Sequence, residues 1–216
     1  MRTVLCYGDS NTWGAATVER PDRRYAPEER WPGVLCTALG PDWLVIEEGL
    51  GGRTTVNDDP VEGIERNGGT YLFPCLASHK PLDVVVIMLG TNDLKARFNK
   101  TPWEIAAGVG RLVSIVKTTP EVGRSGRILE ILVVCPPPTR ADLKDHADMF
   151  AGAPSKSKEM AKHYRKMTET AGVHFLDAGA VIESSLVDGF HFDPDAHLVL
   201  GRAIAAAVAR MPGAAA

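Results

Sequence analysis

The sequence predicts a single α/β domain of three layers, in which helices cover both faces of a five-stranded parallel sheet. Short β-branched or apolar runs alternate with helical patterns along the whole chain, an order typical of parallel sheets with helical crossovers. Residues 84–89 are apolar at every position, as expected for a strand that is buried on both faces. No internal repeat or Gly/Ser-rich linker divides the chain, so residues 1–216 are expected to form one domain.

The five strands are predicted from short runs of β-branched, aromatic and other apolar residues, each followed by a loop that contains Gly, Asp or Pro. These runs cover residues 3–7, 43–47, 82–89, 128–135 and 174–176. The fourth run stops at three consecutive prolines, residues 136–138, which cannot continue a central strand because they lack the N–H donors of the ladder.

Five helices are predicted between and after the strands, from apolar residues that recur at helical spacing. They cover residues 30–39, 69–78, 102–118, 157–171 and 194–210. Thr101 and Asp193 are predicted to cap the third and fifth helices, because each precedes a proline and proline is favoured at the first helical position. The two irregular stretches, residues 15–29 and 136–156, are expected to be functional or interface loops.

The composition is that of an ordinary globular protein and disfavours several classes of partner. Hydrophobic residues make up 44% of the chain and charged residues 24%, which is enough apolar material for a core. The 24 Lys and Arg residues are balanced by 27 Asp and Glu residues, so no basic surface for nucleic acid is expected. No apolar run approaches the roughly 20 residues that span a bilayer, and no signal peptide is recognisable. We therefore expect no membrane partner and a cytoplasmic location.

The four cysteines, Cys6, Cys36, Cys75 and Cys135, lie far apart in the sequence. Without a C-x-x-C pair or a histidine at ligand spacing, they predict neither a zinc site nor a disulfide framework. All four are expected to be small buried hydrophobic residues. Metal and nucleotide motifs such as H-E-x-x-H and G-x-x-x-x-G-K-[ST] are absent as well, so the sequence predicts no metal and no cofactor.

Chemistry is expected at the carboxyl ends of the strands, where open parallel sheets bind their ligands. Ser10 follows the first strand in the sequence G-D-S and could be either a nucleophile or a helix cap. His191 ends the sequence D-G-F-H in the loop before the last helix, three residues after Asp188. It could accept the serine proton while Asp188 orients its ring, although a solvated loop histidine is the plainer alternative.

Two further loops could supply hydrogen-bond donors to an oxyanion. Asn92 follows the third strand in the sequence G-T-N-D and carries a side-chain amide. Gly51 and Gly52 follow the second strand, where backbone N–H groups are unobstructed. The carboxylates beside these motifs, Asp9 and Asp93, are expected to hydrogen-bond to their own turns.

The four blocks, at residues 8–10, 51–52, 90–93 and 188–191, together resemble those of the SGNH/GDSL hydrolase superfamily, and the resemblance covers essentially the whole chain. It implies a flavodoxin-like fold with Ser10 as nucleophile, His191 as base and Asp188 as the acid that orients it. By the same resemblance, the oxyanion hole consists of the Ser10 and Gly52 amides and the Asn92 side chain.

Longer matches around these blocks are similar to the bacterial arylesterase/acyltransferase branch, some of whose members perform perhydrolysis; they lie at residues 8–14, 47–50, 53–55 and 87–93. This likeness implies a serine esterase for short-chain, acetyl-type esters, including aryl esters, that acts through an acyl-enzyme and can transfer the acyl group to alcohols or hydrogen peroxide. The implied partners are a small-molecule ester and further copies of the chain in a homo-oligomer, with residues 15–29 and 141–155 as interface loops.

The residues around the nucleophile are candidates for substrate contacts: Asn11, Trp13 and Gly51. Two alternatives to the arylesterase hypothesis stay open. One keeps the chemistry and changes the substrate, to acetylated carbohydrates or acyl thioesters. The other is a catalytically silent α/β binding module, against which the presence of Ser10, Asn92, Asp188 and His191 argues.

Overall fold

The structure is a computed structural model that describes residues 1–125 and 128–212, and it has the predicted three layers. Five parallel strands form one sheet in the order β2-β1-β3-β4-β5, which is the order of flavodoxin-like sheets. The strands are β1 (Arg2–Gly8), β2 (Trp43–Gly49), β3 (Val84–Met88), β4 (Glu130–Cys135) and β5 (His174–Asp177). Each lies within about two residues of its predicted bounds.

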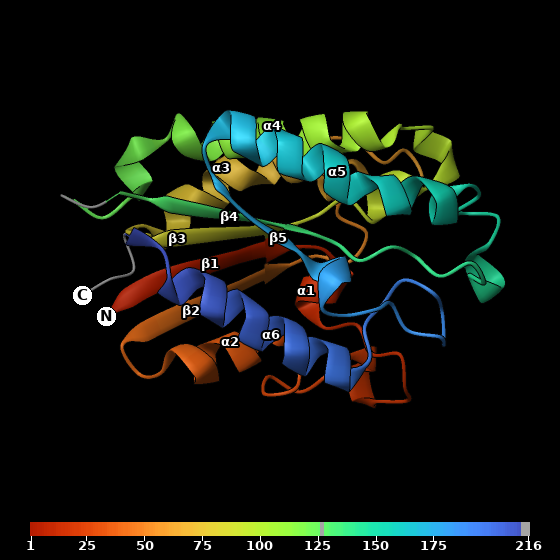
Figure 1. The fold of residues 1–216 in the computed structure, drawn as a ribbon, viewed down its shortest axis with the longest axis horizontal. Coiled ribbons are helices and arrows are strands. Elements are labelled where there is room, and N and C mark those ends of the chain that lie inside the picture. Colours follow the sequence, from red (N-terminus) through yellow and green to blue (C-terminus); the bar gives the residue numbers. More distant parts are fainter. Residues whose placement is uncertain (126–127, 213–216) are drawn as a thin grey trace.

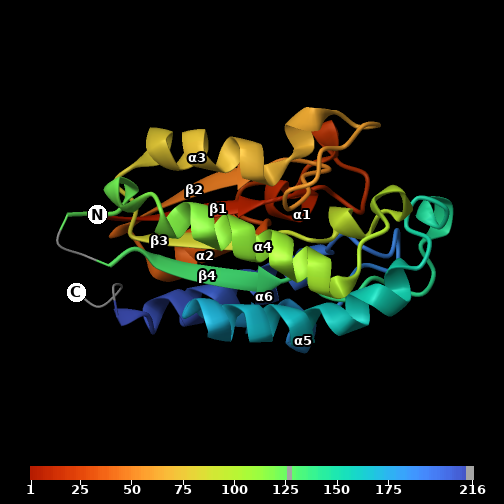
Figure 2. The same ribbon diagram turned by 90° about the horizontal axis from the view of Figure 1, so that it is seen from above.

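Helices cover both faces of the sheet, as Figures 1 and 2 show, with α3, α4 and α5 on one side and α2 and α6 on the other. The helices are α1 (Ser10–Trp13), α2 (Trp31–Leu39), α3 (Gly68–His79), α4 (Pro102–Lys117), α5 (Ala153–Ala171) and α6 (Pro194–Ala209). No helix in the described ranges is both long enough and apolar enough to span a membrane.

Each face of the sheet has its own hydrophobic core, and β3 contributes to both. Val85 and Ile87 belong to the core under α3, α4 and α5, whereas Val84, Val86 and Met88 belong to the core under α2 and α6. This division follows from the period of two in a strand, which sends successive side chains to opposite faces. The wholly apolar run at residues 84–89 is therefore explained by burial on both sides, as predicted.

The helix starts only partly match the sequence prediction. Thr101 caps α4 in a capping box with Glu104, as its sequence indicates. Asp193 occupies the N-cap position of α6, but its carboxylate makes no capping bond. It accepts hydrogen bonds from Thr17 Oγ1 at 2.6 Å and Ser185 Oγ at 2.7 Å instead. Asp193 thus joins the loop of residues 15–29 to the loop that precedes α6.

Three further details differ from the prediction. α5 begins at Ala153, four residues before the predicted start at residue 157, because Pro154 is compatible with the first turn of a helix. The short helix α1 was not predicted, since four residues give no periodic signal. Cys36 is exposed on α2, so the expectation that all four cysteines are buried is wrong for this one.

Candidate active site

The strand order changes direction between β1 and β3, which lie side by side in the sheet (Figure 1). Ser10 and Asn92 follow the carboxyl ends of these two strands. Gly8 ends β1, and a Cβ there would lie 2.0 Å from Thr12 Oγ1 and 2.8 Å from Met88 O. Only glycine therefore permits this close turn from strand to helix. Asp9 then caps α1, because its Oδ1 atom accepts a hydrogen bond from the backbone N–H of Asn11 at 2.9 Å. Ser10 is consequently the first residue of α1, at the rim of the sheet.

A chain of hydrogen bonds joins Ser10, His191 and Asp188. His191 Nε2 lies 3.0 Å from Ser10 Oγ, and His191 Nδ1 lies 2.7 Å from Asp188 Oδ2. An ionised carboxylate can only accept, so Nδ1 carries the ring proton and Nε2 is free to accept the serine proton. The structure thus brings together three predicted residues that are up to 181 positions apart in sequence.

Backbone amides fix the orientation of the Asp188 carboxylate. Its Oδ1 atom accepts hydrogen bonds from the N–H groups of Phe190 at 3.1 Å and His191 at 3.0 Å. Gly189 makes this turn possible with φ of +90°, where a Cβ would also lie 2.8 Å from Asp142 O. Burial raises the pKa of Asp188, but the hydrogen bonds and charge of His191, together with the Phe190 N–H, outweigh burial and hold the pKa below its usual value. Asp188 is therefore ionised around neutral pH.

Asn92 lies between the loops that carry the other two proposed oxyanion donors. Its Nδ2 atom donates to Arg53 O at 3.2 Å, next to Gly52, and to Asp9 Oδ2 at 3.4 Å, next to Ser10. Gly52 has φ of +77°, and a Cβ there would lie 2.5 Å from Glu62 Oε2. Both the left-handed backbone and the close carboxylate favour glycine at this position. Gly51 has open space around its α-carbon.

The other two candidates for substrate contacts have different surroundings. Asn11 is 1% exposed and donates from Nδ2 to Phe190 O at 3.1 Å. This bond ties α1 to the His191 loop, so the position of Asn11 favours a supporting role over direct contact with a substrate. Trp13 is half-buried beneath the Arg24 guanidinium, which lies 4.8 Å from the centre of its ring.

Asp93 accepts a hydrogen bond from its own backbone N–H, as the sequence predicts for its turn, and it is also bonded to a second loop. It is fully buried, and its Oδ1 atom accepts from Thr55 Oγ1 at 2.6 Å and from Asn57 Nδ2 at 2.7 Å. Burial raises its pKa despite these bonds. Asp93 therefore fastens the loop after β3 to the loop after β2. The residues around Asp93 do not indicate these two partners, which lie almost forty positions away in the sequence.

Arg53 and an ion-pair cluster are parts of the site region that the sequence analysis missed. Arg53 is 2% exposed and donates from Nη1 to the carbonyl oxygens of Gly8 and Glu48, joining the ends of β1 and β2. The cluster consists of Asp59, Glu62, Lys95 and Arg97, in which Lys95 Nζ lies 2.5 Å from Glu62 Oε1. These pairings join segments distant in sequence, so no local pattern indicates them.

Asp9 is expected to make stability depend on pH. Burial raises its pKa from 3.8 to about 6, although the Asn11 amide and His191 favour the carboxylate. A raised pKa means that the folded protein binds the Asp9 proton more tightly than the unfolded chain does. This contribution to stability is complete below pH ~4 and is lost as the pH rises through ~6. The pKa shift corresponds to about 3 kcal/mol of folding free energy.

We predict that Asp9→Asn, which cannot ionise, becomes more stable relative to the wild type as the pH rises. The difference in the free energy of unfolding should change by about 2 kcal/mol in favour of the variant between pH 4 and pH 7. Urea unfolding at four pH values measures it. The exposed Asp145 supplies a control, since Asp145→Asn should leave that difference nearly constant. A pH-independent difference for Asp9→Asn would show that Asp9 has an ordinary pKa.

Comparison with known proteins identifies the family. The model of the GDSL-like lipase/acylhydrolase family matches residues 6–199, a range that contains all the candidate residues. The chain belongs to this family. None of the curated proteins matches the chain.

Two solved structures of this family's fold are similar over nearly their whole length. One is Est24, a carbohydrate acetylesterase from Sinorhizobium meliloti, with 45% sequence identity and a TM-score of 0.90. The match covers 97% of this chain and 99% of Est24. The other is the inhibitor-bound aryl esterase of M. smegmatis, with 44% identity, a TM-score of 0.90 and coverage of 96% of this chain and 98% of that one.

Proposed function

We propose that the chain is a serine carboxylic ester hydrolase that cleaves short-chain, acetyl-type esters, aryl esters among them, with residues 1–216 acting as one catalytic domain. The hydrogen-bonded chain from Asp188 through His191 to Ser10 carries this proposal. A serine hydroxyl is a weak nucleophile until a base takes its proton, and the base needs a carboxylate to hold its tautomer. The family match and the names of the two similar structures support the same chemistry.

In the proposed mechanism, Ser10 Oγ attacks the ester carbonyl while its proton passes to His191 Nε2. The C–O bond of the ester then breaks, and the leaving alkoxide takes that proton from His191. Water attacks the resulting acyl-enzyme with His191 again as base, which releases the carboxylic acid and restores Ser10. An alcohol or hydrogen peroxide in place of water would give a new ester or a peracid.

Asn92 is proposed to stabilise the oxyanion together with the Ser10 and Gly52 amides. We predict that Asn92→Ala lowers kcat for aryl acetate by roughly 10²–10³, the usual cost of one lost oxyanion donor. KM should change much less, because the donor acts on charge that develops in the transition state. Steady-state kinetics measure both constants. A loss of less than about threefold would remove Asn92 from the mechanism.

The substrate class is tested by initial rates on a matched series of esters. The series compares aryl acetate, butyrate and octanoate, an acetylated sugar and an acetyl thioester. We expect aryl acetate to be cleaved and the rate to fall by about tenfold or more as the acyl chain outgrows the pocket. A higher kcat/KM for the sugar acetate would favour the carbohydrate acetylesterase function, which the similarity to Est24 supports. No hydrolysis of any ester by the folded protein would contradict the proposal.

The homo-oligomer and the cytoplasmic location expected from the sequence stay predictions. Sedimentation of the purified chain measures its oligomeric state.

A further inference from the structure

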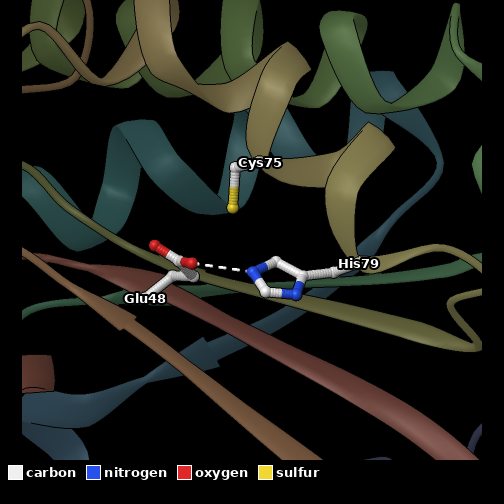
Figure 3. Close-up of side chains that lie close together, drawn as sticks. All are labelled: Glu48, Cys75 and His79. Carbon is white, nitrogen blue, oxygen red and sulfur yellow. Dashed lines mark hydrogen bonds and ion pairs between the residues drawn. The ribbon is translucent and has the colours of Figure 1, made fainter.

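A second group of chemically reactive side chains lies at the outer edge of the sheet, away from the Ser10 hydroxyl. Figure 3 shows Glu48 on β2 facing Cys75 and His79, which both come from α3. One ligand atom of each residue lies within 4.8 Å of the others, and His79 Nε2 lies 2.8 Å from Glu48 Oε1. Among the described residues, this is the one group of at least three that combines such atoms at metal-binding distances.

The local structure explains why these three side chains meet. Cys75 and His79 are four residues apart on a helix, so they lie one above the other on the same face. On β2, neighbouring side chains point to opposite faces of the sheet. Glu47 accordingly pairs with Arg30 on the far face at 2.5 Å, whereas Glu48 faces α3.

We propose that Glu48, Cys75 and His79 bind a divalent metal ion of intermediate softness, with zinc as the best fit. Thiolate, imidazole and carboxylate are the three ligand types that zinc accepts in proteins. Ligand atoms at about 2.0–2.3 Å from the ion would be roughly 3–4 Å apart. Side-chain movements of the order of 1 Å would therefore bring the three atoms to these distances. The proposal does not depend on Ser10 or on the proposed esterase function.

The space beside Glu48 would let an ion enter from solvent. It would also leave room for water as a fourth ligand. A cavity of about 500 Å³ borders Glu48 and is also lined by Arg53, Tyr71 and Pro74. The Arg53 guanidinium is a nearby positive charge that opposes binding of a cation, and it lies 5.5 Å from the Tyr71 ring centre. We therefore expect weaker binding than in structural zinc sites, which use four protein ligands.

Binding must release one proton from the Cys75 thiol as the metal–sulfur bond forms. Cys75 is 1% exposed, and burial together with the Glu48 carboxylate raises its pKa to about 12. The thiol is therefore protonated until an ion displaces the proton.

Cobalt(II) provides a spectroscopic test, because a cobalt–thiolate bond gives a charge-transfer band that histidine and carboxylate ligands do not. The exposed Cys36 is first replaced, so that Cys36→Ser serves as the parent protein, tag-free and treated with chelator. We expect one Co²⁺ per chain with this band, and zinc should abolish the band by competition. Cys75→Ser should remove the band, and His79→Gln should weaken binding by about tenfold or more.

A matched control and a second readout keep the test decisive. His163 is a partly buried histidine on α5, and His163→Gln should bind cobalt as the parent does. Zinc at about 100 times Kd should raise the Tm of the parent by roughly 5–10 °C and leave that of Cys75→Ser unchanged. His79→Gln changes a side chain that is 30% exposed, so this variant is expected to fold even if Cys75→Ser does not. A parent without the charge-transfer band, or an unweakened band in His79→Gln, would overturn the proposal.

Discussion

Replacing Ser10 by alanine is expected to lower kcat for aryl acetate hydrolysis by on the order of 10⁶, the scale measured for a catalytic serine in a serine protease. The variant loses the hydroxyl oxygen that His191 is placed to activate, since Nε2 lies 3.0 Å from Ser10 Oγ. Residual acceleration over water should come from the oxyanion donors, which the substitution leaves in place. Initial rates with purified wild type and variant measure the loss.

The fold should survive this change, and that can be checked independently. Ser10 caps no helix, because Asp9 occupies the N-cap of α1. Circular dichroism of Ser10→Ala should therefore match that of the wild type. A phosphonate ester should label the wild type once per chain at Ser10 and leave the variant unlabelled. Ser78→Ala, on the exposed surface of α3, serves as the control and should keep full activity. Activity of Ser10→Ala within tenfold of the wild type would refute Ser10 as the nucleophile.

The fold could be predicted from the sequence because the strongest signals in the sequence are local. The doubly buried β3, the alternation of strands and helices, and the Thr101–Pro102 helix start each follow from period, composition or capping within a few residues. The hydrogen-bonded contact of Ser10, His191 and Asp188 could be anticipated because the carboxyl ends of parallel strands converge at one edge. The resemblance of the four blocks to a known family indicated that these three residues act together.

Two differences at polar side chains have the opposite character, because they concern partners distant in sequence. The hydrogen bond from Thr55 to Asp93 was not predicted, and Asp193 was predicted to cap a helix but accepts a hydrogen bond from Thr17 instead. The proposed metal site has the same character, because Glu48 on β2 lies far in sequence from Cys75 and His79 on α3. Side chains of the same type thus take different roles according to contacts that no local pattern encodes.

Asp188→Asn is expected to lower kcat by up to about 10⁴ with the fold unchanged. The reason lies in the two backbone N–H groups, of Phe190 and His191, that donate to Asp188 Oδ1. These donors require a carbonyl oxygen at the Oδ1 position of the asparagine, because an NH₂ group there would face them donor to donor. The NH₂ group must therefore take the Oδ2 position, 2.7 Å from His191 Nδ1.

An NH₂ group facing Nδ1 makes Nδ1 the acceptor and moves the ring proton to Nε2. The histidine then donates to Ser10 Oγ and cannot take its proton, so the base is lost although every heavy atom keeps its place. Activity measurements give the size of the loss, and the NMR shifts of the His191 ring nitrogens report the tautomer directly. Asp142→Asn, at an exposed side chain in the neighbouring loop, should retain both activity and tautomer in the control. Near-full activity in Asp188→Asn, or an Nδ1-protonated ring, would mean that another group orients His191.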